Sequence, residues 1–295
     1  MTEQLAGAVV VGVDGSDSAL DATRWAAAEA ARRGAPLRLV AAVAWTIFRP
    51  IGLPALGQEY QRQVVERAAG EHLEAAAAVA REIAPGLEIE QKVAGGEPPV
   101  VLRGESERAA LVVLGTRGRG GFAGLLLGSV AIGVAAHAGC PVVVVRGAPP
   151  AVEGPVLVGL DRHGDDETAL GFAFEEAARR GAPLVAVHAL SGAVLDPFLV
   201  PLLDWAVVRA DEEKALRERL AGWTTKYPGV EVTTVVVVDG AARELVARSA
   251  GAALVVVGSR GRGPVGGPLL GSVSQAVLHH AACPVAVVRP ETVAP

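Results

Sequence analysis

The chain has 295 residues, a formal net charge of −5 and two cysteines, and its length suits about two ordinary domains. Its 27 lysines and arginines are dispersed and form no basic stripe, so we predict no nucleic-acid partner. Two cysteines far apart make a poor disulfide framework, and the N-terminus does not resemble a signal peptide. We therefore expect a reduced, cytoplasmic protein.

The first half alternates apolar strands with helices. Residues 8 to 13 form a continuous apolar run, which is typical of a strand in a parallel sheet covered on both faces. The sequence predicts further strands at 37–44, 87–93, 111–114 and 141–145. It predicts helices from about residue 20 to Gly34, and at 59–84, 98–106 and 129–138. The irregular segment 45–57 fits an ordinary packed connection, with a lid or partner surface as the alternative.

The second half repeats this order. Strands are predicted at 156–160, 184–190, 230–238 and 285–288, with helices at 166–180 and about 203–227. Such alternation requires parallel strands joined by right-handed crossovers. The predicted fold class is α/β, with two tandem doubly wound domains at 1–147 and 155–295, a linker at about 148–154, and a five-stranded parallel sheet of order 3-2-1-4-5 in each.

Two long stretches, 120–145 and 263–288, contain no Asp, Glu, Lys or Arg. A membrane helix needs about 20 such residues. Both stretches, however, are interrupted by glycine and proline, so a loop, a short buried helix and a core strand account for them better. We predict no membrane span.

One loop occurs twice. Gly115-Thr-Arg-Gly118, with Gly128-Ser129 after nine intervening residues, recurs as Gly258-Ser-Arg-Gly261 followed at the same spacing by Gly271-Ser272. Each copy follows a β-branched run and precedes a helix. Glycines let backbone amides approach an anion closely, and the start of a helix offers unpaired amides to the same charge. The repeat therefore predicts a phosphate-binding loop in each half.

An aspartate follows the first predicted strand of each half, Asp14 in the first and Asp161 in the second. Ligands of doubly wound sheets bind beyond the carboxyl ends of the strands, where the first and fourth strands flank a crevice. An acid there would repel phosphate but would accept a hydrogen bond from a ribose hydroxyl or an adenine amino group, so the pairing favours a nucleotide. Helix capping is the alternative role of Asp14. Arginines beside the loops would reach the phosphates or remain solvated: Arg117, Arg119, Arg260 and Arg262.

Several motifs are missing from the sequence. It has no G-x-x-x-x-G-K-[ST] loop, no G-x-G-x-x-G opening the first helix of either half, and no metal-ligand cluster. His137 and His280 are interpreted as packing histidines, and Cys140 and Cys283 as small buried hydrophobes. We predict no catalytic residue and no metal ligand.

At these residues the chain resembles the universal stress protein family in its tandem form, over nearly its whole length. The family signature G-x2-G-x9-G-[ST] is met once in each half, and the family's strand-one acid is met by Asp14 and Asp161. The resemblance implies ATP as the ligand, with or without Mg²⁺. The acid would contact the adenosine, the glycine loop would hold the phosphates, and the ends of the second strands, near Ala42 and Ala189, would approach the adenine.

The residues predicted to contact nucleotide fall into two equivalent sets. In the first half they are Gly12, Asp14, Ala42, Gly115, Arg117, Gly118, Arg119, Gly128, Ser129 and Val130. In the second half they are Gly159, Asp161, Ala189, Gly258, Arg260, Gly261, Arg262, Gly271, Ser272 and Val273. After Asp161 the chain continues Arg162-His163-Gly164, where Asp14 is followed by Gly-Ser, so the second site is expected to bind more weakly.

The resemblance also implies that family domains pair through their last strands, 142–145 and 285–288, and that the chain forms a homodimer. Our hypothesis is an ATP-binding regulator of the stress response, in which bound nucleotide biases conformation or assembly. A slow ATPase or adenylyl-transferring enzyme is a second hypothesis. A nucleotide-free interaction module, whose loops are only turns, is a third.

Overall fold

The structure, a computed structural model, describes residues 7–44, 58–118, 127–147, 154–161, 166–190, 204–238, 240–259 and 270–290, with backbone only for residues 58–61. The segment 45–57, predicted as a connection or lid, and Arg119, Arg260, Gly261 and Arg262 of the predicted sites lie outside these ranges. The chain divides into two compact units, 1–149 and 150–295.

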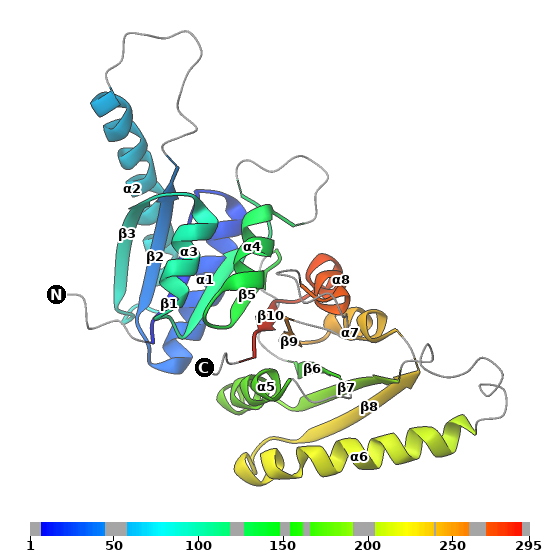
Figure 1. Cartoon of the computed structure of the whole chain (residues 1–295). Coiled ribbons are helices and arrows are strands. Elements are labelled where there is room, and N and C mark those ends of the chain that lie inside the picture. Colours follow the sequence, from blue (N-terminus) through cyan, green and yellow to red (C-terminus); the bar gives the residue numbers. More distant parts are fainter. Residues whose placement is uncertain are drawn as a thin grey trace, which may run out of the picture. The chain divides into compact units, whose positions relative to one another are not determined.

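Unit 1 is a doubly wound α/β domain (Figure 1). Its strands are β1 (Val9–Gly12), β2 (Leu37–Val43), β3 (Ile89–Gly95), β4 (Leu111–Gly115) and β5 (Val142–Val145), in the order β3-β2-β1-β4-β5. The strands pair in parallel throughout, for example Val9 with Leu37 and with Leu111. The predicted fold class and the order 3-2-1-4-5 are confirmed in this half.

Four helices cover the two faces of the unit 1 sheet. They are α1 (Asp17–Arg33), α2 (Gln58–Ile83), α3 (Pro98–Ser106) and α4 (Ser129–His137). Helices α1 and α2 pack on one face and against each other, while α3 and α4 pack together on the other. The central strands are buried on both sides, since Val9, Val11, Leu111 and Val113 are fully shielded from solvent. This double burial explains their continuous apolar sequences.

Unit 2 has the same plan. Its strands are β6 (Val156–Leu160), β7 (Leu184–Leu190), β8 (Val232–Val238), β9 (Leu254–Gly258) and β10 (Val285–Val288), in the order β8-β7-β6-β9-β10. All neighbours are parallel. Its helices are α5 (Glu167–Arg180), α6 (Trp205–Lys226), α7 (Ala241–Ser249) and α8 (Ser272–His280).

The corresponding helices α2 and α6 pack differently in their own units. Helix α2 packs against α1, β2 and β3, whereas the main contacts of α6 are with β8. Alanines Ala69 and Ala76 allow the close approach in unit 1, because both are buried between α2 and its neighbours. The residues at the corresponding positions of α6, 143 residues later, are Glu212 and Arg219. Their longer side chains need more room than alanine.

Within the described ranges, no helix combines the length and apolar character that crossing a bilayer needs. The charge-free stretches contribute α4, β5, α8 and β10 to the two folded units. The apolar sequence of β5 and β10 accords with their burial, since all eight strand residues are shielded from solvent.

Candidate functional site

In unit 1 the predicted acid and the predicted loop meet at the carboxyl end of the sheet. Asp14 follows β1 and Gly115 ends β4, and β1 and β4 are hydrogen-bonded neighbours. A methyl group built on Gly118 would overlap the Asp14 carboxylate, so the two residues are in direct apposition. The site therefore joins residues about a hundred positions apart in the sequence.

Helix capping, the alternative role of Asp14, is performed by Ser16. The Ser16 hydroxyl accepts a hydrogen bond from the Ala19 amide at 3.2 Å, which makes Ser16 the N-cap of α1. One Asp14 oxygen, Oδ1, accepts hydrogen bonds from the Ser16 amide at 3.0 Å and the Ser16 hydroxyl at 2.6 Å. Helix α1 consequently begins at Asp17, three residues earlier than predicted. The other Asp14 oxygen, Oδ2, faces Gly118.

The loop after β4 is fastened to the start of α1. The Ser16 hydroxyl, which donates to Asp14, also lies 3.3 Å from the Arg117 carbonyl oxygen, and the Arg117 amide donates to the Ser18 hydroxyl at 3.4 Å. The Ser18 and Thr116 hydroxyls lie 3.4 Å apart. A methyl group on Gly115 would overlap Ser18, so glycine is required where the strand ends. Together these contacts fix the loop beside Asp14.

Helix α4 begins beside this loop with an uncapped first turn. Its N-cap residue is Gly128, which has no side chain to accept from the helix amides. In the described part of unit 1, the amides of Ser129 and Val130 have no protein acceptor. Unpaired first-turn amides carry the positive end of the helix dipole and attract anions. Ser129 is exposed, so its amide and hydroxyl lie where a ligand can reach.

Two predicted donors are already used by the protein. The Gly128 amide donates to the Thr116 carbonyl at 2.7 Å, and the Arg117 amide is held by Ser18 as described. In unit 2 the Gly271 amide donates in the same way to the Ser259 carbonyl at 3.0 Å. The prediction that the glycine amide of each Gly-Ser pair is free for phosphate is therefore corrected. They close the loop, and the next amides along the helix remain available.

Gly12 and Gly159, also predicted as ligand contacts, lie where the chain packs closely. A methyl group on Gly12 would lie 2.7 Å from Leu114, and one on Gly159 would lie 2.8 Å from Leu245. Each glycine thus allows a leucine to cover the central strand. Ala42 is half-buried on β2 next to β1, at the position where the nucleoside end of a ligand was predicted.

Arg146 contributes a positive charge that the sequence interpretation missed. It follows β5, the neighbour of β4, and burial lowers its pKa, with a further lowering by the nearby positive charge of Arg117. Two guanidinium groups that repel each other favour an anion between or beside them. The sequence repeat could have pointed to Arg146, because Arg289 follows β10 at the equivalent position of the second half.

Neither cysteine has the surroundings of a nucleophile. Burial raises the pKa of both the Cys140 and the Cys283 thiols to about 12, so little nucleophilic thiolate forms at neutral pH. The His137 ring nitrogen Nδ1 lies 2.9 Å from the Gly133 carbonyl of its own helix. Among the described residues, no three His, Cys, Asp or Glu side chains are placed to hold a metal ion.

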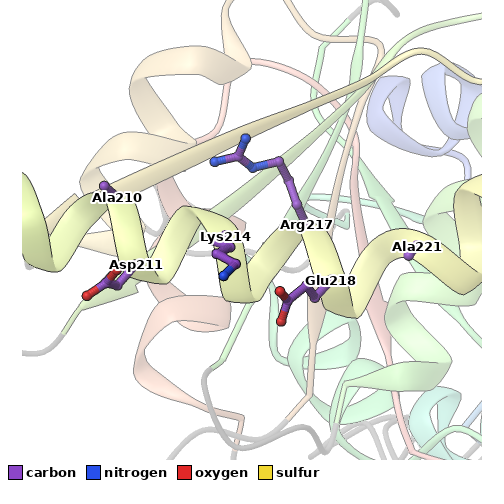
Figure 2. Close-up of a pocket in the computed structure, with 6 residues that line it drawn as sticks. All are labelled: Ala210, Asp211, Lys214, Arg217, Glu218 and Ala221. Carbon is purple, nitrogen blue, oxygen red and sulfur yellow. The ribbon is translucent and has the colours of Figure 1, made fainter.

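Two shallow grooves lie away from this site. One runs along α6 and is lined by Ala210, Asp211, Lys214, Arg217, Glu218 and Ala221, all on a single helix (Figure 2). The other is lined by residues of α2. Side chains from one exposed helix face do not converge on a common point, so neither groove is a candidate site.

The fold and the repeated loop define a tandem pair of doubly wound α/β domains, each with a glycine loop and an uncapped helix at the carboxyl end of the sheet. The universal stress protein family profile matches residues 7–146 and 154–289. The chain belongs to the universal stress protein family.

A related protein and a solved structure each match nearly the whole chain. Universal stress protein Rv2005c of Mycobacterium tuberculosis strain H37Rv is 43% identical over 291 residues, which cover 95% of this chain and 96% of that protein. The crystal structure of a universal stress protein from Archaeoglobus fulgidus covers 97% of this chain and is itself covered to 99%, with a TM-score of 0.70 and 21% identity. Another A. fulgidus universal stress protein, solved in complex with dAMP, covers 48% of this chain and is covered to 98%, at 28% identity and a TM-score of 0.36.

Proposed function

We propose that unit 1 binds ATP, with or without Mg²⁺, and that the chain is a nucleotide-dependent regulator of the stress response. The observation that carries this proposal is the uncapped start of α4 beside the Asp14–Gly118 contact. It provides unpaired amides for phosphate and a carboxylate oxygen for the nucleoside at the same edge of the sheet. Membership of the family supports it.

Each residue of the proposed site has a physical role. The Ser129 and Val130 amides, with the Ser129 hydroxyl, hold the phosphates. Arg117 and Arg119 add positive charge, as does Arg146. Asp14 accepts a hydrogen bond from the ribose or the adenine, and the β2 end near Ala42 borders the base. Gly115 and Gly118 keep the loop close enough to Asp14 for one nucleotide to touch both.

The regulatory part of the proposal follows from differential binding. A nucleotide that bridges the start of α4 and the turn after β1 stabilises the conformation in which the two are in place. We further propose domain boundaries of 1–147 and 155–295, a cytoplasmic location, and a homodimer whose assembly responds to this change. Steady-state ATP hydrolysis clearly above that of buffer, lost on substitution of Ser129, would favour the enzyme alternative instead.

The proposal is tested by calorimetric titration of nucleotide-stripped protein with ATP, using Gly118→Ala as the diagnostic variant. The added methyl group displaces the Asp14 carboxylate, so we expect the ATP affinity to fall about tenfold, equivalent to about 1.4 kcal/mol. The melting temperature should change little, because the overlapping atom is the end of an exposed side chain.

The matched control is Gly104→Ala. Gly104 lies in α3, and a methyl group there meets nothing within 4 Å. This variant should bind ATP like the wild type and be more stable by about 0.5–1 kcal/mol. Absence of ATP binding by the wild-type protein would rule out the proposed function. Wild-type affinity in Gly118→Ala would rule out the assigned site.

A further inference from the structure

Three alanines of unit 1 are replaced by ionisable residues in unit 2. Ala41 of β2 and Ala69 and Ala76 of α2 are buried, whereas the residues at the equivalent positions are His188, Glu212 and Arg219. The equivalence is fixed by the repeated Arg-Arg-Gly-Ala-Pro-Leu sequence, by the register of β2 with β3 and of β7 with β8, and by the matching ends of α2 and α6.

Arg219 binds the turn that follows β6. Its Nη1 donates to the Asp161 carbonyl at 3.0 Å, and its Nη2 donates to Asp166 Oδ1 at 2.6 Å. Its Nε and Nη2 also donate to Glu167 Oε1 at 3.2 and 3.0 Å. The side chain is largely buried, at 22% exposed, and the carboxylates raise its pKa against the lowering effect of burial. Such charge-assisted, multiply bonded contacts are strong and directional.

Both main-chain polar groups of Asp161 are hydrogen-bonded to side chains of this network. Its carbonyl accepts from Arg219, and its amide donates to Asp166 Oδ2 at 2.6 Å. Asp166 occupies the N-cap position of α5, but its side chain makes no capping bond. The backbone at the strand-one acid of unit 2 is therefore tied to the ion network of Arg219, Asp166 and Glu167. In unit 1 the equivalent turn is closed by Ser16, with one Asp14 oxygen facing the loop.

Further side chains of unit 2 pack near the end of β6, where the nucleoside part of a ligand would be expected. The His188 ring is buried, with Nδ1 3.2 Å from the Leu160 carbonyl and Nε2 3.8 Å from the Glu212 carboxylate. Trp223 donates from Nε1 to Glu167 at 3.1 Å and stacks on Phe174. Ala41 and Ala76, the equivalents of His188 and Arg219, are small and buried, so the side chains beside the end of β6 are larger and more polar than those at the same place in unit 1.

The loop of unit 2 also lacks the contact that positions the loop of unit 1. Thr116 lies beside Ser18, but the equivalent hydroxyl, that of Ser259, is buried and has no hydrogen-bond partner in the structure. A buried hydroxyl without a partner is destabilising, so among the described residues the Thr116–Ser18 contact has no counterpart at Ser259.

We infer that the chain binds a single nucleotide, in unit 1, and that the Arg219 network keeps unit 2 from accepting the nucleoside. This inference rests on the proposed function and deepens it. Unit 2 then keeps the same conformation with and without ATP, and the regulator responds to one ATP per chain. The Arg219 contacts provide the specificity, because they fix the backbone of the turn at Asp161, which a nucleoside would otherwise approach.

The test combines stoichiometry with the location of the bound ligand. Calorimetric titration of nucleotide-stripped full-length protein with ATP should give one site per chain. Photolabelling with 8-azido-ATP, followed by peptide mass spectrometry, should modify peptides from residues 1–149 alone, and excess ATP should suppress the label.

The outcomes separate the two claims. Two nucleotides per chain, or ATP-suppressible labelling of residues 150–295, would overturn the inference and leave ATP binding intact. The absence of ATP binding would overturn both the inference and the proposed function. One nucleotide per chain with labelling confined to unit 1 would establish both.

Discussion

Replacing Gly128 with aspartate is expected to abolish ATP binding without harming the fold. Gly128 has the extended backbone of an N-cap residue, φ −79° and ψ 152°, and a methyl group there meets its nearest neighbour at an ordinary 3.5 Å. An aspartate side chain would accept hydrogen bonds from the first-turn amides of α4. It would thus occupy the donors assigned to phosphate and repel the phosphate charge.

The expected loss of ATP affinity is about 100-fold or more, because hydrogen bonds to a charged group contribute about 1.5–3 kcal/mol each and two amides are involved. Stability should rise by a few tenths of a kcal/mol, since an acidic N-cap is favoured over glycine. Opposite effects on binding and stability distinguish this variant from one that merely unfolds. Calorimetry and thermal unfolding measure the two quantities.

Gly86→Asp is the matched control, because it adds the same charge at an exposed turn where a side chain meets nothing within 4 Å. Its ATP affinity should equal that of the wild type. If Gly128→Asp also bound ATP normally, the start of α4 would not be the phosphate site.

The largest loss of stability is expected for Glu176→Ala. Glu176 lies in α5, is fully buried, and contacts the guanidinium of Arg180, which is only 3% exposed. Removing one partner of a buried ion pair leaves the remaining charge poorly compensated, which costs about 3–5 kcal/mol. Chemical unfolding should show this loss.

The neighbouring residue provides the control. Glu175 pairs with Arg179 on the surface, where the two side chains are 42% and 33% exposed. Exposed pairs contribute little, so Glu175→Ala should change stability by about 0.5 kcal/mol or less. Equal effects of the two substitutions would show that burial of Glu176 does not determine its contribution.

The fold was predictable because its signals are local and occur twice. Continuous apolar runs such as that ending at Val13 predict strands buried on both faces, and the alternation with helices predicts a parallel sheet. The start of α1 was placed too late because Asp14, Ser16, Asp17 and Ser18 are all residues that favour N-caps. Only the hydrogen bond from the Ala19 amide to the Ser16 hydroxyl selects among them.

The site was predictable in outline but not in its individual donors. Sequence spacing placed Asp14 and Gly118 at the same edge of the sheet, and the structure brings them into contact. The sequence spacing did not indicate that the Gly128 amide donates to the Thr116 carbonyl, because that hydrogen bond depends on the path of the loop. The Arg219 network was also missed, because Arg219 lies more than fifty residues from the turn it binds.

We propose that the Ser129 and Val130 amides bind the phosphates of ATP. NMR spectroscopy can follow these two amides individually. Amide proton and nitrogen NMR shifts of Ser129 and Val130 should be recorded during titration with ATP, and separately with tripolyphosphate and with adenosine. We expect large shifts at these amides with ATP and tripolyphosphate, and shifts around Asp14 with ATP and adenosine. Saturating ATP binding that leaves the Ser129 and Val130 amides unmoved would contradict this proposal.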